Sequence, residues 1–497
     1  MTRYRDFRGV ARPVGVVVMG LGVALGLCGL AGWGFDMVLP PLGTQVMRGE
    51  WALGLSAGAA FALGAGLIVF GRRHASGDLT RREAILAVAL IWSASSAIGA
   101  LPFVLGAQMS VVDALFESVS GLTTTGATVI GDIEGRLNRP LLLWRSLLQW
   151  LGGMGIVVLF VAVFPNIGAG GKFMFGEEVP GTTAEGLRPR IAETSRILWQ
   201  FYLAFTVVEF LVLFLLGMST FEALCHALTT MSTGGFSTRD DSIGAFADPW
   251  IEVVIASFML IASVNYGLFH ASIRGRTLRV FLRSAEFRTY VVVVVVSTLL
   301  LAFIILGQNE GDLLRSLRIA LFTVATFISS TGYGTEDYMA YPQMGLWLIL
   351  SLMFLGGCAG STAGGIKVER VVLMLKLVWA ELRRSFRPAL VHVVRMGRTV
   401  VPQSALTDVA VFLVVYMGGL ALLTGTVATL EGHPLPAAFG ASLSCLSNMG
   451  PAPFHLGADN FVAYGVASKL LFMLGMLLGR LEFFALLALV VPDFWRR

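Results

Sequence analysis

The sequence predicts an all-α membrane protein in which four similar units each contain a half-length apolar segment. Two observations support this fold class: 56% of the 497 residues are hydrophobic and only 13% are charged, and long apolar runs recur along the whole chain. A typical soluble domain carries roughly 25% charged residues. Each run is close to the roughly 20 residues that a helix needs to cross a bilayer. Because lipid offers the backbone no hydrogen-bond partner, we expect these runs to be helices.

Two apolar runs near 13–38 and 51–70 come first and define an N-terminal segment at 1–75 with two transmembrane helices. In each of four following units, a long first span precedes a half-length segment, a glycine-containing turn and a second long span. The units are expected at 76–170, 171–285, 286–398 and 399–497. Their first spans lie near 84–105, 191–217, 287–307 and 405–430. Their second spans lie near 141–164, 250–270, 344–378 and 461–491.

The half-length segments are too short to cross a bilayer. They lie near 111–123, 220–232, 315–329 and 435–447. Such segments occur at membrane depth as re-entrant helices that line a cavity or pack inside protein. We therefore predict ten transmembrane helices with four re-entrant pore helices, arranged as fourfold pseudosymmetric span–pore loop–span repeats after the two extra N-terminal spans.

Charge sets the expected orientation. Lys and Arg cluster in the connections on one side, whereas the opposite connections carry mostly acids: Asp132, Glu134, Asp240, Asp241, Asp248, Glu310, Asp312, Glu336, Asp337, Glu431 and Asp459. If the basic side is cytoplasmic, both termini are cytoplasmic and all four half-length segments enter from outside. The net charge of +5 then reflects topology, and we expect no nucleic-acid partner.

The cysteines and histidines form no recognisable chemical site. Cys28, Cys225, Cys358 and Cys445 lie in apolar or small-residue segments without CxxC spacing, so we expect neither a disulfide framework nor a zinc site. The sequence also lacks a nucleophile–His–acid arrangement, a P-loop and a dinucleotide fingerprint. We therefore predict that the protein is not an enzyme.

The turns after the four half-length segments align with one another. The sequences are VDALFESVSGLTTTGAT, FEALCHALTTMSTGGFS, RIALFTVATFISSTGYGT and LPAAFGASLSCLSNMGP, and the alignment places Gly126, Gly235, Gly332 and Gly450 in equivalent positions. One such turn alone is often an ordinary glycine C-cap. Four of them, each after a half-length segment, indicate a shared site. The third turn, 331–334, reads TGYG and closely resembles the TVGYG filter of potassium channels.

This pattern predicts a cation filter surrounded by four loops. A dehydrated potassium ion needs rings of oxygen ligands, which backbone carbonyls supply. Glycine reaches the backbone angles that turn successive carbonyls inward, and the half-helices direct their partly negative C-terminal ends toward the ion. The predicted potassium-binding filter residues are Thr124, Thr125, Gly126, Thr233, Gly234, Gly235, Ser330, Thr331, Gly332, Asn448, Met449 and Gly450.

A candidate gate lies in the second span of the third unit. Five glycines interrupt this span: Gly356, Gly357, Gly360, Gly364 and Gly365. Each costs a helix about 1 kcal/mol relative to Ala, so a regular helix is not expected. One interpretation is close helix packing through small residues, and the other is a flexible loop that blocks the pore below the filter.

Arg480 is a second candidate gate residue, because a charge deep in the last span is costly and needs a cavity or a partner. Arg480 either forms a structural ion pair with Glu482 or another acid, or lines the pore opposite the glycine loop and helps to restrain it.

Three further segments carry a family resemblance. They are WRSLLQWLGGMGIVVL at 144–159, FLGGCAGSTAGGIKVER at 354–370 and LLGRLEFFALL at 477–487. Together with the four units and the two extra N-terminal spans, they resemble the Trk/Ktr/HKT superfamily of potassium transporters, specifically the bacterial Trk-type pore-forming membrane subunit. The resemblance covers essentially the whole chain, and the fourth turn departs most from it but keeps Gly450. Plant relatives that favour sodium resemble this pattern with Ser at the first filter glycine, so Gly126 favours potassium.

The resemblance implies potassium uptake across the bacterial inner membrane, with potassium as the substrate and no covalently bound cofactor. It also implies a homodimer, surrounding membrane lipid, and control by a separate cytoplasmic subunit with Rossmann-like domains that bind NAD or ATP. An alternative is a symporter that couples potassium to protons or sodium. For such coupling, Glu209 is the clear mid-span candidate outside the Arg480 region.

Overall fold

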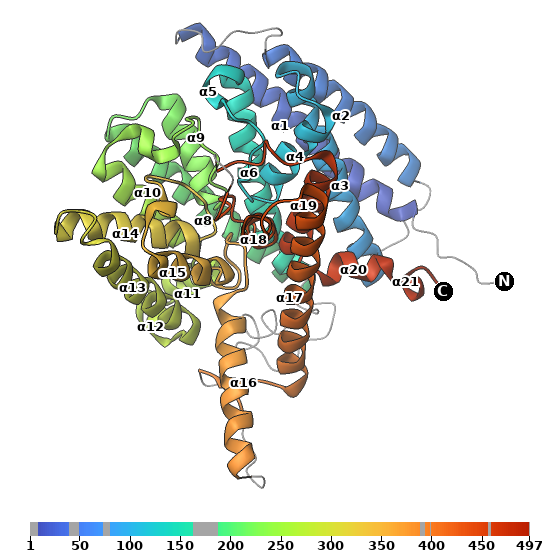
Figure 1. Ribbon diagram of the computed structural model, residues 1–497. Coiled ribbons are helices and arrows are strands. Elements are labelled where there is room, and N and C mark those ends of the chain that lie inside the picture. The colour runs from blue at the N-terminus through green and yellow to red at the C-terminus, as the bar shows by residue number, and fades with distance from the viewer. Residues whose placement is uncertain are drawn as a thin grey trace.

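The computed structural model describes residues 8–38, 49–72, 80–162, 187–387, 393–397, 399–455 and 459–496. These residues are mostly helical (Figure 1). Within these ranges, the single sheet is an antiparallel pair of two-residue strands, β1 (Arg395–Met396) and β2 (Thr399–Val400). Lys172, one of the basic residues on the predicted cytoplasmic side, lies outside the described residues.

The N-terminal helices α1 (Ala11–Val38) and α2 (Gly49–Gly71), preceded by the short helix η1 (Arg8–Val10), lie side by side at one edge of the molecule (Figure 1). Small residues line their contact, since a Cβ atom on Gly15 would lie 2.7 Å from the carbonyl oxygen of Gly64. Close backbone approach of this kind stabilises helix pairs in lipid, where the hydrophobic effect contributes little. Helix α1 also packs against helices of the first unit.

The predicted units share an order of long helix, short helix and further helices. The long first helices are α3 (Arg81–Gly106), α8 (Leu187–Leu215), α13 (Ala285–Ile305) and α17 (Gln403–Glu431). The short helices are α4 (Val111–Leu122), α9 (Thr220–Met231), α14 (Leu313–Ile328) and α18 (Leu435–Ser447). The connections after them contain α5 (Ile133–Arg136), η5 (Ser242–Phe246) and η6 (Tyr338–Ala340).

The helices of the predicted second spans differ from unit to unit. The first unit has the continuous helix α6 (Arg139–Ala162). The second has α10 (Pro249–Ala262) and α11 (Tyr266–Gly275), followed by α12 (Arg279–Arg283). The third has α15 (Gln343–Phe354) and α16 (Val368–Phe386), and the fourth has α19 (Val466–Arg480), α20 (Phe484–Val490) and α21 (Pro492–Trp495).

A helical membrane protein is confirmed in outline. Among the described residues, six helices are long and apolar enough to cross a bilayer: α1, α2, α3, α8, α13 and α17. The number rises to eight if the pairs α10–α11 and α19–α20, bent by 86° and 118°, each form one span. The second spans predicted at 250–270 and 461–491 thus each contain a sharp bend that the sequence analysis does not anticipate.

Specific polar contacts explain the two bends. After α10, the Asn265 side chain caps α11 by accepting a hydrogen bond from the Gly267 N–H at 2.8 Å, and the Ser263 carbonyl accepts one from the Cys358 N–H at 2.8 Å. After α19, Glu482 has a positive φ of 57° and its carboxylate accepts a hydrogen bond from Arg370 at 2.5 Å. An apolar run contains no record of such distant partners, so the pattern of hydropathy does not indicate the bends.

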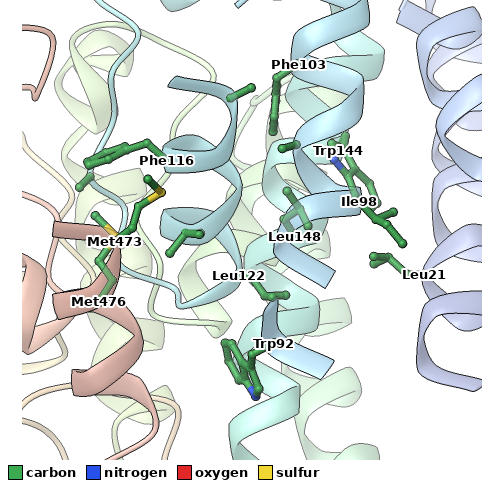
Figure 2. Packing of buried hydrophobic residues seen from close by; sticks show 14 of the residues in the cluster. Leu21, Trp92, Ile98, Phe103, Phe116, Leu122, Trp144, Leu148, Met473 and Met476 are labelled. Atoms are coloured by element: carbon green, nitrogen blue, oxygen red, sulfur yellow. The ribbon is translucent and has the colours of Figure 1, made fainter. Parts of the chain in front are cut away.

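A buried hydrophobic cluster surrounds α4 and joins the last unit to the first (Figure 2). It contains Phe116 and Leu122 of α4, Leu148 of α6, and Met473 and Met476 of α19. Because α19 belongs to the fourth predicted unit and α4 to the first, their packing brings the two ends of the repeat series together. Each apolar side chain buried in this way contributes about 1.5–3 kcal/mol where it is withdrawn from water.

Candidate functional site

The four short helices end in the same hydrogen-bonded turn. After α4, the Thr124 N–H donates to the Gly121 carbonyl at 3.0 Å and the Thr125 N–H donates to the Ser120 carbonyl at 2.8 Å. This pair of bonds is the Schellman arrangement of a helix C-terminus. The same two bonds occur in the other three turns, with the donors Thr233 and Gly234, Ser330 and Thr331, and Asn448 and Met449.

Glycine does not occupy the left-handed position that it usually fills in this turn. That position is taken by Thr124, Thr233, Ser330 and Asn448, with φ between 52° and 55°. A non-glycine residue there costs about 1–3 kcal/mol. The predicted glycines lie two residues later, also with positive φ: Gly126 (82°), Gly235 (74°), Gly332 (86°) and Gly450 (98°). They are therefore not ordinary glycine C-caps, and another constraint must require them.

The neighbouring turn supplies this constraint. A Cβ atom on Gly126 would overlap the Gly234 carbonyl oxygen, and one on Gly235 would overlap that of Thr331. A Cβ atom on Gly332 would overlap the Met449 carbonyl oxygen. In the last turn, a Cβ atom on Gly450 would lie 2.9 Å from the Thr125 carbonyl oxygen. The contacts run from the first turn to the second, third and fourth and back to the first, so the four turns form a closed ring.

Hydrogen bonds between units hold the ring together. The Tyr333 hydroxyl of the third turn lies 2.5 Å from the Thr229 hydroxyl of α9. The Asn448 amide of the fourth turn donates to the Thr125 hydroxyl at 3.0 Å and to the Met476 carbonyl at 2.9 Å. The side chains of the predicted filter are buried, whereas Gly126, Gly235 and Gly332 are partly accessible.

A buried ion pair lies beside the first two turns. The Arg145 Nε atom of α6 donates to Glu117 of α4 at 2.6 Å, and Arg145 also donates to the Ser237 carbonyl at 2.9 Å. Glu117 accepts further hydrogen bonds from the Thr128 hydroxyl and the Val129 N–H. Removing two charges from water is costly, and these additional hydrogen bonds offset part of that cost.

The five glycines of the candidate gate lie in a non-helical loop at 355–367, between α15 and α16. Within the loop, the Gly356 N–H donates to the Ile366 carbonyl at 2.8 Å. The Gly364 N–H donates to the Ser330 hydroxyl at 2.5 Å, and a Cβ atom on Gly364 would lie 3.0 Å from Asn448 Cβ. The loop therefore contacts the left-handed residues of the third and fourth turns.

Backbone carbonyls are the hydrogen-bond partners of Arg480. This buried side chain donates to the Thr362 carbonyl of the loop at 2.9 Å and to the Gly152 carbonyl of α6 at 3.5 Å. Glu482, the acid expected as its alternative partner, instead pairs with Arg370 at 2.5 Å. Arg480 thus connects the glycine loop to the first unit.

A cavity of about 20 Å³ lies between the loop and the end of α19, lined by Gly364, Lys367, Asn448, Arg480 and Glu482 among others. This volume holds about one water molecule. The Lys367 ammonium group also donates to the Ala363 carbonyl of the loop. Cationic side chains therefore gather on one side of the turns.

Basic residues partly offset the acids on the opposite side. Arg239 pairs with both Glu222 and Glu134, at 2.6 and 3.0 Å, and Lys469 pairs with Asp113 at 2.7 Å. These ion pairs make this side of the turns less acidic than the sequence alone indicates.

Comparison with known proteins identifies the family. A family model of cation transport proteins, TrkH, matches residues 55–496. The chain belongs to this family. The Trk system potassium uptake protein TrkH of Salmonella typhimurium is 37% identical over 500 residues, covering 99% of both chains. The Escherichia coli K12 protein of the same description is 39% identical over 432 residues, covering 85% of this chain and 88% of its relative.

A solved structure agrees with this assignment. The crystal structure of the potassium transporter TrkH from Vibrio parahaemolyticus has a TM-score of 0.87 and 31% identity, and covers 99% of this chain and 100% of that chain. The protein is thus a membrane transporter of the TrkH family, and the prediction that it is not an enzyme agrees with its relatives.

Some residues at the site of this TrkH-family protein were not singled out from the sequence. Glu117 is a charged residue within an apolar half-length segment, and a charge in such a segment indicates a buried partner. A buried tyrosine hydroxyl usually has a hydrogen-bond partner, but the sequence around Tyr333 does not show which distant residue supplies it.

Proposed function

We propose that this chain mediates potassium uptake through a filter formed by its four glycine turns. The closed ring of turns carries this proposal, since each glycine lies against a carbonyl oxygen of the next turn. Rings of carbonyl oxygens replace the hydration shell of a potassium ion. The relatives named as potassium uptake proteins support the choice of ion, as does glycine at position 126.

We further propose that the loop at 355–367 is the gate. Its contacts with Ser330, its proximity to Asn448 and its bond to Arg480 support a closed arrangement in which the loop and its cations block one end of the filter. Opening would require the loop to leave these partners. The loop's glycines make such rearrangement possible at low steric cost.

Topology and assembly belong to the same proposal. We infer ten spans and four re-entrant helices in the inner membrane of a bacterium, with both termini in the cytoplasm. The unit boundaries lie near 75, 170, 285 and 398. A homodimer and a cytoplasmic nucleotide-binding subunit that senses NAD or ATP would complete the system, as Trk-type resemblance implies.

Symport is the less favoured alternative. Coupling to protons requires a carboxyl group on the ion pathway that gains and loses a proton. Glu209 is fully buried, and its surroundings among the described residues offer no cationic partner. Ionising a carboxyl group in that environment would cost much free energy. Glu209 is therefore better suited to staying neutral than to binding and releasing a proton during transport.

Flux of rubidium into proteoliposomes at set voltages tests the proposal. A channel predicts that flux reverses at the potassium equilibrium potential whatever the proton gradient, and that Gly126→Ser lowers the preference for rubidium over sodium. A reversal potential that moves with pH would instead establish symport. Unchanged selectivity in Gly126→Ser would count against the filter.

A further inference from the structure

Gln149 of α6 makes two hydrogen bonds to the second turn. Its Nε2 atom donates to the Gly234 carbonyl at 2.7 Å, and its Oε1 atom accepts from the Phe236 N–H at 3.0 Å. The side chain is fully buried. One amide group thus satisfies a backbone acceptor and a backbone donor two residues apart, so both ends of the Gln149 side chain are committed to this turn.

Arg145, one helical turn before Gln149 in α6, also contacts the second turn. Its guanidinium donates to the Ser237 carbonyl at 2.9 Å and lies 3.5 Å from the centre of the Phe236 ring. Residues four apart lie on the same face of a helix. Arg145 and Gln149 therefore hold the second turn from a helix of the first unit.

This contact explains why the second turn contains two adjacent glycines. At the position just before the shared glycine, the other turns carry Thr125, Thr331 and Met449, whereas the second carries Gly234. A Cβ atom on Gly234 would overlap the Gln149 amide. Any larger residue at 234 would displace Gln149 from its two partners.

We propose that Gln149 is a positioning residue that sets the ion preference of the filter by fixing the Gly234 carbonyl. This inference rests on the proposed filter. The Gly234 carbonyl oxygen and those of Thr125, Thr331 and Met449 occupy equivalent positions in the four turns. Each of these oxygens lies close to the shared glycine of a neighbouring turn. A carbonyl released from its donor can tilt, and the ring then adapts to a smaller ion such as sodium.

Gln149→Glu tests this role with almost no change in shape. Its carboxylate form keeps an acceptor for the Phe236 N–H but has no donor for the Gly234 carbonyl. Because its protonated form keeps a donor, the ratio is measured at high pH, where the carboxylate form predominates. Leaving a buried group unsatisfied costs about 1–3 kcal/mol, so the ratio of rubidium to sodium uptake is expected to fall about tenfold. The ratio does not depend on how much protein folds. Gln308→Glu is the matched control, because Gln308 donates to the Ala340 carbonyl at 2.9 Å on an exposed surface.

A second pair of variants keeps the inference testable if Gln149→Glu does not fold. Gly234→Thr gives the second turn the residue found at 125 and 331 but collides with Gln149. Gln149→Ala removes the same hydrogen bond without the collision, so the variant that combines it with Gly234→Thr is expected to be no less selective than either single variant, and this non-additivity is the coupling that a double-mutant cycle measures.

The outcomes separate this inference from the filter itself. A reduced ratio in Gln149→Glu with an unchanged ratio in Gln308→Glu supports the positioning role, as does a double variant whose ratio is no lower than that of either single variant. If Gly126→Ser lowers the ratio but neither the Gln149→Glu substitution nor the double-mutant cycle shows an effect, the role of Gln149 is overturned and the filter stands. If Gly126→Ser also leaves the ratio unchanged, both proposals fail.

Discussion

The four turns share one backbone conformation, whereas the helices that follow them have four different structures. The turns repeat the same hydrogen bonds with Thr, Thr, Ser and Asn in the left-handed position. The second helices are continuous in α6, bent by 86° after α10, interrupted after α15 and bent by 118° after α19. A ring around one ion needs equivalent oxygens from every unit, but a single loop is sufficient to close a pathway. The comparison therefore separates a symmetric element, the proposed filter, from an asymmetric element, the proposed gate.

Gly235→Ala should break the symmetric element most severely. The added methyl group overlaps the Thr331 carbonyl oxygen, and φ is positive at this position. We expect rubidium flux to fall by more than about tenfold, because strain of this kind costs about 1–3 kcal/mol. Gly334→Ala is the control, since a Cβ atom there meets no neighbour within 4 Å. Equal flux in the two variants would contradict the packed ring.

Arg480→Ala should release the asymmetric element. The charged hydrogen bond to the Thr362 carbonyl contributes about 1.5–3 kcal/mol to the closed arrangement. We expect flux to rise about tenfold in proteoliposomes at fixed voltage, with unchanged selectivity. Arg480→Lys retains the charge and should give an intermediate flux. A flux equal to that of the unaltered protein would remove Arg480 from the gate.

Ser330→Ala should weaken the connection between the two elements. It deletes the hydroxyl that accepts the hydrogen bond from the Gly364 N–H, a neutral bond that contributes about 0.5–1.5 kcal/mol. Flux should rise roughly threefold. In Ser351→Ala, the lost hydroxyl bonds only within α15, so no increase is expected. A fall in flux in Ser330→Ala would show that the hydroxyl contributes to ion passage and does not hold the loop closed.

Glu209→Gln should have the smallest effect. If this carboxyl group is permanently neutral, the amide replaces it at nearly the same size, and flux should stay within about twofold. Reversal potentials measured at several pH values should match those of the unaltered protein. A pH dependence that Glu209→Gln abolishes would make Glu209 a coupling residue and restore the symport alternative.

The sequence predicted the turns better than the helices around them. The glycines at 126, 235, 332 and 450 align because each turn must meet the same steric demand, and this demand leaves a repeated residue type. The bends after α10 and α19 left no such pattern, because they depend on single contacts such as those of Ser263 and Glu482. Apolar residues on both sides of a bend look like one continuous span.

By itself, the sequence determined the helical membrane class, the four repeats and the positions of the glycines. Composition, hydropathy and spacing are local properties of the chain, and they carry this information directly. Only the tertiary structure decided why the glycines are required and what Arg480 and Gln149 bind. Gln149 and Gly234 are 85 positions apart and Arg480 and Gly152 are 328 apart. Partners at such separations are brought together by the packing of whole units, which no local pattern records.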